Sequence, residues 1–522
     1  MREMKFTRRE SVKLGLLTGV GLGAPLGRVA GPVERLVESM NITSPRVEKF
    51  EVPLPVPPVL EPTSSDETTD YYEITQQKGT VEILPGYDTT IWGYNGIFPG
   101  PTIEAKRGRE VVIEQRNELP VPVSTHLHGG VTPPESDGFP TDLILPPDLS
   151  VDDLPGHISG TVAGVSHGSK TYRYPNEQRA ATLWYHDHRM DFTGPQVYKG
   201  LAGFYLIRDD IEDELPLPDG EKEVPLMIAD RTFTDDGEMY YPSVDPSLLG
   251  DHGVLASTSF GPHTGVFGDT ILVNGAPWPR MEVSNTKYRF RVLNASNARA
   301  YELALEPSPS EGNSFVQIGS DGGLLSEPIR HDELRVSPAE RFDVVIDFSQ
   351  YPVGSEITLV NRRGEGRVSD VMRFEVVREE EDESEIPAQL APQLDFPSPG
   401  EAETTRRFFF IAGMLGGMST INNKGYDPER IDAKPRLGAT EIWEFDADPA
   451  HPIHMHLVHF KVISRNGGPP GPYDAGWKDT VFLDGGTVRV VAKFTPYRGK
   501  YVFHCHNLEH EDMMMMANFE VV

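Results

Sequence analysis

Cysteine is almost absent from this chain, because Cys505 is the only one among 522 residues. A single thiol cannot form an intramolecular disulfide, which excludes a disulfide-stabilised scaffold. Cations are also few: 48 Lys and Arg stand against 79 Asp and Glu, and lysine is scarcer than arginine. The net charge of −31 repels phosphate, so we expect no nucleic-acid partner. An acidic surface with little lysine favours adaptation to high salt, where ions screen the repulsion between carboxylates.

Long apolar runs are missing as well. No segment after the N-terminal region has the roughly 18 uninterrupted apolar residues of a transmembrane helix, so we expect no membrane span in the mature protein. Residues 1–30 begin basic, with Arg8 and Arg9, and continue into a short apolar stretch broken by glycines. This pattern predicts a twin-arginine-type signal, the route by which folded proteins are exported. We therefore expect a secreted or extracytoplasmic protein.

Helical periodicity is not sustained anywhere. Short alternating runs such as GTVEIL, KYRFRVLNAS and VRVVAKF are separated by many of the 50 Gly and 46 Pro. These features predict an all-β fold of three sandwich or barrel domains. The expected parts are a signal segment (1–30), a linker or wrapping arm (31–65), a first β domain (66–208), a second β domain (223–378), an acidic exposed connector (379–404) and a third β domain (405–522).

Histidines are concentrated rather than scattered. Ten of the 16 fall in four clusters, each with an H-x-H pair: His126 and His128, His186 and His188, His451 with His454 and His456, and His504 with His506 and His510. On a strand, residues i and i+2 share a face, so both imidazoles can reach one metal or two adjacent metals. Four pairs offer eight imidazoles, more than the roughly four to six ligands of one ion. The pattern predicts a cluster of several metals.

Cys505 lies between His504 and His506, so on a strand its side chain points to the opposite face. It can therefore serve a second site behind the cluster. His451 and His510 remain unassigned, and a run of four methionines follows. One thiolate, two imidazoles and a weak thioether are the ligands of a blue copper centre. The backbone around Cys505 would then join a one-electron site to a multi-metal site.

The segments THLHGG, WYHDHRM, HPIHMHLVHF and HCHNLEHEDMMMM resemble, in order and kind, the four copper motifs of the multicopper oxidases. Others, such as FPGPTIEAKRG and GDTILVNGAPWP, resemble the bacterial spore-coat (CotA-type) laccase branch, over about residues 66–522. The resemblance implies three cupredoxin-like Greek-key domains and four copper ions: one type 1, one type 2 and two type 3. The middle domain, without paired histidines, is expected to be a spacer that helps to shape the substrate face. The export signal and the missing disulfide argue against a spore-coat role.

The resemblance also assigns roles to residues. It implies type 2 ligands at His126 and His454. It implies type 3 ligands at His128, His186, His188, His456, His504 and His506. It implies type 1 ligands at Cys505, His451, His510 and an axial Met515, with Met514 and Met516 as alternatives. Asp137 and Glu511 match positions where this branch keeps acids along the dioxygen and water channels, and a carboxylate is a suitable proton donor there.

The implied function is that of a laccase. A small aromatic reductant gives one electron to the type 1 copper, through the exposed edge of a type 1 histidine, and O₂ is reduced to water at the other three coppers.

Oxidation of cuprous or manganous ions, or of a bilirubin-type pigment, is the alternative function. The absence of a long Met-rich insert disfavours cuprous oxidation. A copper-free scaffold protein would lack the ligands, and a two-domain nitrite reductase would be shorter. We expect a monomer.

Overall fold

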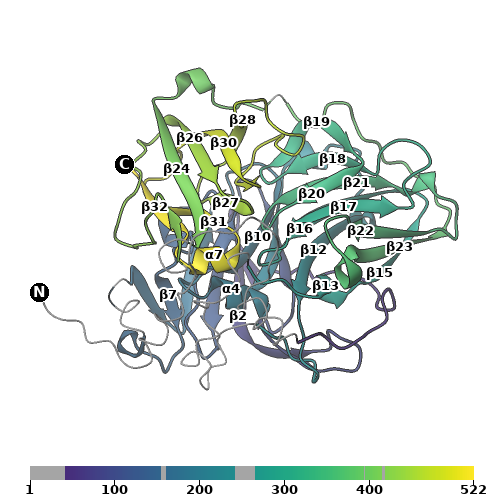
Figure 1. The fold of residues 1–522 in the computed structure, drawn as a ribbon, viewed down its shortest axis with the longest axis horizontal. Coiled ribbons are helices and arrows are strands. Elements are labelled where there is room, and N and C mark those ends of the chain that lie inside the picture. The colour runs from purple at the N-terminus through teal and green to yellow at the C-terminus, as the bar shows by residue number, and fades with distance from the viewer. Residues whose placement is uncertain (1–41, 155–159, 161, 242–264, 393, 414–417) are drawn as a thin grey trace, which may run out of the picture. The chain divides into compact units, whose positions relative to one another are not determined.

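The computed structural model describes residues 42–154, 160, 162–241, 265–392, 394–413 and 418–522. The predicted signal segment lies outside these residues. Residues 43–522 form one compact unit, built mainly from six β-sheets that pack in three pairs, each around its own core (Figure 1). The predicted all-β fold is confirmed. The predicted domain limits stay a prediction.

The first pair of sheets holds two of the histidine pairs. One sheet contains β1 (Ser64–Ser65), β2 (Thr69–Val81), β5 (Glu110–Asn117) and β9 (Ser169–Tyr174), with β3 (Thr89–Tyr94) paired to β2. The other has the order β4 (Gly100–Lys106), β11 (Ala202–Arg208), β10 (Ala181–Asp187), β6 (Thr125–His128). A small parallel pair, β7 (Asp142–Leu145) and β8 (Gly164–His167), lies beside them. Side chains from both sheets form the first core.

The second pair of sheets carries no paired histidine. Its larger sheet has the order β14 (Ala276–Pro277), β13 (Thr270–Val273), β12 (Glu223–Arg231), β16 (Lys287–Asn294), β21 (Arg341–Asp347), β18 (Phe315–Ser320), β19 (Gly323–His331). The smaller has the order β15 (Arg280–Ser284), β23 (Asp370–Arg378), β22 (Glu356–Asn361), β17 (Tyr301–Glu306), β20 (Glu333–Val336). An aromatic-rich second core fills the space between them.

The third pair holds the other two histidine motifs. One sheet has the order β25 (Met418–Ile421), β24 (Thr404–Gly413), β26 (Thr440–Ala447), β30 (Gly486–Lys493), β28 (Phe460–Arg465). The other has the order β29 (Thr480–Leu483), β27 (His451–Met455), β31 (Gly499–Cys505), β32 (Met516–Val521). Alternation decides the faces: in β24, Phe408 and Phe410 enter the core while Phe409 is exposed.

Strands β27 and β31 differ from β24 because every residue of β27, and the last five of β31, are buried. One face packs in the third core through Ile453, Met455, Phe503 and Cys505. The other face carries His454 and His504, so it must be covered by something other than this core. Histidines of the first pair of sheets cover it, and Figure 1 shows β10 beside β27 and β31.

Two connecting segments pack against the sheets. Residues 43–60 lie along the sheets: the amide N–H groups of Phe50 and Leu54 donate to Trp278 and Arg280, and that of Leu60 donates to Thr102. Within 379–404, predicted to be exposed, Leu390 and Ala391 are buried among the leucines of β19, although the acidic residues before them are largely exposed. Their apolar side chains explain the difference.

Helices are few and short among the described residues. The α-helices are α4 (Thr193–Tyr198), α5 (Asp210–Asp213) and α7 (Leu508–Asp512). Several 3₁₀ turns accompany them: η1 (Pro134–Ser136), η2 (Val151–Asp153), η3 (Gly220–Lys222), η5 (Phe348–Gln350), η6 (Gly366–Ser369) and η7 (Pro399–Glu401). None of the described helices has the length and apolar character needed to cross a membrane. Helices α4 and α7 lie against each other beside the histidine strands (Figure 1).

Candidate metal centre

Four strands bring the paired histidines together. In the antiparallel pair β6 and β10, His126 lies opposite His186. In the antiparallel pair β27 and β31, His454 lies opposite His504. Three of the four residues between the paired histidines enter the core of their own sheets, namely Leu127, Met455 and Cys505. The histidines therefore leave each sheet on its other face, and the two faces meet.

Where the two faces meet, eight histidines form one buried cluster. The Nε2 atom of His504 lies 3.1 Å from that of His188 and 3.3 Å from that of His456. The Nε2 atoms of His126 and His454 are 3.4 Å apart. Nitrogens about 2 Å from one tetrahedral ion are separated by roughly this distance. Residues more than 300 positions apart in the chain thus converge as ligands of a shared ion would.

The ligand atoms fall into groups of three. Within each group they lie within 4.8 Å of one another: His126 with His454 and His456, His128 with His186 and His506, and His188 with His456 and His504. All of these side chains are buried. The groups draw on both ends of the chain, so neither end has a complete set.

Hydrogen bonds decide which ring nitrogen faces the cluster. The Nδ1–H of His126 donates to the Asp137 carbonyl at 2.6 Å, and that of His186 donates to the Asp187 carbonyl at 2.8 Å. Each leaves Nε2 with its lone pair directed inward. His128 is turned round: its Nε2 is the bonded atom, and its buried Nδ1 has no hydrogen-bond partner among the described residues. Unpartnered buried nitrogens of this kind fit a metal ion.

Burial sets the charge of the cluster. It lowers the pKa of seven of the imidazoles, and several neighbouring histidines lower it further: His126, His128, His186, His188, His454, His456 and His506. For His188 the pKa falls to about 4. Neutral imidazole is the form that binds metals, so little proton release accompanies binding.

Cys505 contacts a separate group on the other side of β31. Its Sγ lies 3.3 Å from Nδ1 of His451 and 3.7 Å from Nδ1 of His510, and the two nitrogens are 3.3 Å apart. A triangle with these sides has its centre about 2 Å from each corner, close to metal–nitrogen and metal–sulfur bond lengths. Burial raises the pKa of the Cys505 thiol, so a cation is needed to hold the thiolate.

Three of the four methionines lie in two different environments. Met515 is fully buried in the same core as Cys505, and the Cys505 amide donates to the Met515 carbonyl at 3.1 Å. Met514 and Met516 instead pack in a neighbouring cluster with Val502. The separation favours Met515 over its neighbours as the fourth group of the cysteine site.

Comparison with known proteins agrees with this donor set. Family models described as "Multicopper oxidase" match residues 75–151, 156–212 and 395–522. A laccase of Bacillus subtilis is 39% identical over 539 residues, covering 91% of this chain and 99% of that protein. The chain belongs to the multicopper oxidase family. It is a laccase-like oxidoreductase.

Two further comparisons define this multicopper oxidase's relatives. A laccase of Haloferax volcanii is 35% identical over 560 residues, covering 96% of this chain and 89% of that protein. A crystal structure of a multi-copper oxidase from Pediococcus acidilactici has a TM-score of 0.77 and 30% identity, covering 92% of this chain and 93% of the other. The cupredoxin-like architecture expected from the sequence is confirmed. The family uses copper, and the buried nitrogen and sulfur donors fit that metal.

The two acids predicted from the sequence, Asp137 and Glu511, both contact the histidine cluster, but their pKa values shift in opposite directions. One oxygen of Asp137 accepts from His456 Nδ1 at 2.8 Å, and the other lies 3.7 Å from His126 Nδ1 without a hydrogen-bond partner among the described residues. Burial raises the pKa of Asp137 well above the usual value. Glu511 accepts from the Thr193 hydroxyl at 2.7 Å and lies 3.0 Å from His504 Nδ1. Burial acts to raise its pKa, but His504 and His188 outweigh this effect and lower it to about 2. Of these two acids, Asp137 is the one suited to carry a proton near neutral pH.

The prediction that a type 1 histidine has an exposed edge is wrong. His451 and His510 are 0% and 1% exposed. Instead, the outer nitrogen of His451, Nε2, donates to Asp448 at 2.7 Å, and the Asp448 side chain is 41% exposed. The cysteine site is therefore linked to the surface by a hydrogen bond to a carboxylate, which sequence spacing did not indicate.

The sequence motifs also gave no indication that Asp479 contacts the histidine cluster. Its carboxylate accepts from His128 Nε2 at 3.1 Å, and its carbonyl accepts from His454 Nδ1 at 3.0 Å. Arg341, from the middle sheets, donates to the same carboxylate. Neither residue belongs to a repeated motif, and folding brings them together across 138 positions. The middle sheets are thus in contact with the histidine cluster, beyond the spacer role expected of them.

The other histidines form no comparable group among the described residues. His331 contacts Gln317, and His459 contacts the Gly129 carbonyl at 3.0 Å. His157, His252 and His263 lie outside the described residues.

Proposed function

We propose that this protein is a laccase that holds four copper ions, oxidises small phenolic or aromatic reductants one electron at a time and reduces O₂ to water. One observation carries the proposal. Adjacent residues of a single strand, Cys505 and His504, contact two different groups of metal-binding side chains. This arrangement suits electron transfer between two copper sites, which a protein that only stores metal does not need.

The groups of three are compatible with the ligand assignment that the resemblance implies. The type 1 ion would be held by Cys505, His451, His510 and Met515. The type 2 ion would be held by His126 and His454. The two type 3 ions would be held by His128, His186 and His506 and by His188, His456 and His504. The ions supply one-electron acceptance at the first site and multi-electron reduction of O₂ at the other three.

The chain's own residues would carry electrons and protons. The backbone from Cys505 to its two neighbours is the shortest covalent path between the sites. Asp137, with its raised pKa and one oxygen without a hydrogen bond among the described residues, would deliver protons next to His456. Glu511, ionised, would instead orient His504 and balance the positive charge of the ions.

The reductant would dock near Asp448. Its exposed carboxylate can accept a hydrogen bond from a phenol or an aromatic amine, while its bond to His451 leads inward to the type 1 site. The acidic chain would work at high salt, after export in folded form by the twin-arginine route. The net charge of −31 and the similarity to a Haloferax laccase support this environment.

Copper-loaded protein tests the proposal. We expect four coppers per chain, a blue absorption band, and consumption of one O₂ per four molecules of phenol oxidised, without release of peroxide. A panel of phenols, aromatic amines, bilirubin, cuprous and manganous ions, run across salt concentrations, identifies the reductant class. A colourless protein, or one that oxidises only metal ions, would overturn the assignment as a laccase.

A further inference from the structure

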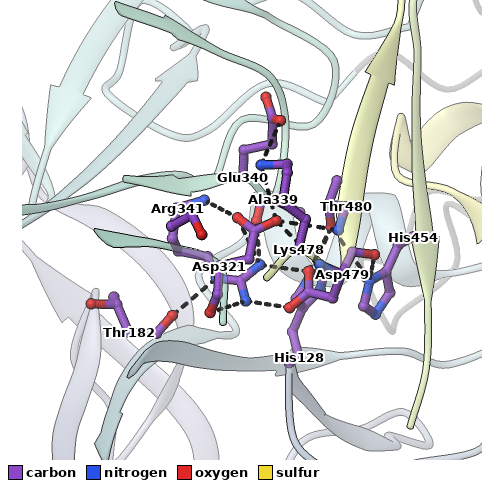
Figure 2. A network of polar contacts seen from close by, with 12 residues as sticks. His128, Thr182, Asp321, Ala339, Glu340, Arg341, His454, Lys478, Asp479 and Thr480 are labelled. Atoms are coloured by element: carbon purple, nitrogen blue, oxygen red, sulfur yellow. Dashed lines mark hydrogen bonds and ion pairs between the residues drawn. The ribbon is translucent and has the colours of Figure 1, made fainter. Parts of the chain in front are cut away.

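Arg341 links the middle sheets to the histidine cluster through Asp479 (Figure 2). We propose that Arg341 is a positioning residue: by clamping Asp479, it determines which ring nitrogens His128 and His454 present to their copper ions. The proposal rests on the copper assignment given above. It makes the middle sheets, which provide no ligand among the described residues, part of the copper site.

Asp479 accepts hydrogen bonds from two histidines, one through its side chain and one through its backbone carbonyl. Its side-chain oxygen Oδ1 lies 3.1 Å from Nε2 of His128, and its backbone oxygen lies 3.0 Å from Nδ1 of His454. A carboxylate and a carbonyl only accept, so each imidazole must donate at that nitrogen. His128 is thereby left to bind through Nδ1, and His454 through Nε2. One residue thus fixes opposite tautomers in a type 3 ligand and a type 2 ligand.

Arg341 uses every N–H of its guanidinium to hold this arrangement. Its Nη1 donates to Asp479 Oδ1 at 2.8 Å, and its Nη2 donates to Oδ2. The three remaining N–H groups donate to backbone carbonyls of Thr182, Ala339 and Asp321, at 3.0, 2.9 and 3.2 Å. Because all five N–H donors are used, the planar guanidinium group cannot rotate without breaking several hydrogen bonds. Lysine could supply the charge but not this geometry.

A second acid, Asp321, fixes the backbone on both sides of the contact. One of its oxygens accepts from the Arg341 amide at 2.8 Å, and the other from the amides of Asp479 and Thr480 at 3.3 Å each. Lys478 lies 3.2 Å from Asp321 and 3.1 Å from Glu340 (Figure 2). All five charged residues of this network are buried. Buried ion pairs are expensive to desolvate and are weak stabilisers, so their presence favours a positioning role.

Gly129, the residue after His128, shows how tightly this contact is packed. A Cβ atom there would lie 2.6 Å from Arg341 Nη2 and 2.8 Å from Asp479 Oδ2. The residue also has a φ of +85°, which favours glycine. Any side chain would therefore push the Arg341–Asp479 pair away from His128. The motif THLHGG thus accommodates the clamp as well as the metal.

The variant Arg341→Met tests the proposal, with Arg289→Met as the matched control. Arg289 is equally buried in the same middle sheet and pairs with Asp343, with no histidine among its partners. Both variants lose a buried ion pair, so both should unfold at lower temperature. For Arg341→Met alone, we expect the dissociation constant of the type 2 copper to rise roughly 10- to 100-fold and its electron paramagnetic resonance spectrum to change. Blue absorption from the Cys505 site should persist.

Asp479→Asn provides a second and more selective test. It removes the charged acceptor of His128 but keeps the carbonyl that holds His454. We expect the near-ultraviolet absorption of the type 3 pair to change more than the type 2 resonance. Arg341→Lys should fall between wild type and Arg341→Met.

The outcomes separate the inference from the proposed function. Wild-type copper content and spectra in Arg341→Met, or equal losses in Arg289→Met, would overturn the positioning role. Wild-type protein without copper at the histidine cluster would overturn the proposed function itself.

Discussion

Cys505 and His504 are neighbours in the chain, yet their side chains belong to different sites. The sulfur of Cys505 lies 3.3 Å from His451 Nδ1, and His504 Nε2 lies 3.1 Å from His188 Nε2. Strand alternation alone produces this division. A single peptide unit therefore separates the proposed electron-accepting site from the oxygen-reducing site, and changes on the two sides can be tested independently.

Replacement of Cys505 by Ser should remove the blue absorption and the oxidation of phenols, because a hydroxyl does not provide a thiolate ligand. The eight histidines do not depend on the sulfur, so about three coppers should remain. Metal analysis measures the copper content, and visible absorption measures the blue band. A blue, active variant would contradict the role of Cys505.

Met515→Leu should raise the reduction potential of the type 1 copper, because the weak axial thioether is lost while the core volume is kept. Met516→Leu is the control, since Met516 packs in a different cluster. Redox titration of the blue band compares them. A shift in the Met516 variant only would show that the axial assignment is wrong.

Asp448→Asn should also raise the type 1 potential, because neutralising a carboxylate bonded to His451 makes the oxidised ion less stable. If reductants dock there, KM for phenols should increase as well. Asp446→Asn, which alters a carboxylate bonded to Thr487, is the control. Unchanged potential and KM in the Asp448 variant would remove Asp448 from the electron-entry path.

Gly129→Ala should reproduce the copper loss of Arg341→Met, because the new methyl group meets the Arg341–Asp479 pair. Gly86→Ala is the control, since Gly86 has a similar φ of +83° but nothing within 4 Å of the added Cβ. Both variants carry backbone strain, and only the first should lose type 2 copper. Equal copper contents would refute the steric argument.

Stability should fall in acid partly through Glu212, which is buried beside Arg289 and Arg291. Burial acts to raise its pKa, but Arg291, Arg289 and Arg208 outweigh this and lower it from 4.5 to about 2. The ionised carboxylate therefore stabilises the fold above pH 4.5, and this contribution, about 3 kcal/mol, is lost as the pH falls toward 2.

The measurement for Glu212 is denaturant unfolding of copper-free protein across this pH range. Glu212→Gln should show a flatter dependence than wild type between pH 4.5 and 2. Parallel curves for the two proteins would show that Glu212 does not titrate in this window.

The strands and the histidine pairs could be predicted from sequence because both follow from alternation with a period of two. The same alternation predicted that Cys505 faces away from His504 and His506. Arg341 and Asp479 could not be predicted, since each is a single charged residue in an ordinary strand or loop. Their roles arise from packing between sheets that are far apart in the chain. The burial of His451 and His510 likewise depends on tertiary packing.

The histidine cluster has a consequence for how the protein acquires its metal. Its proposed ligands come from residues 126–188 and 454–506, and none of the three all-histidine groups is complete within either range. A growing chain therefore cannot hold these ions until its last strands have been made and docked. Uptake of these ions must therefore accompany or follow the docking of the two ends of the chain.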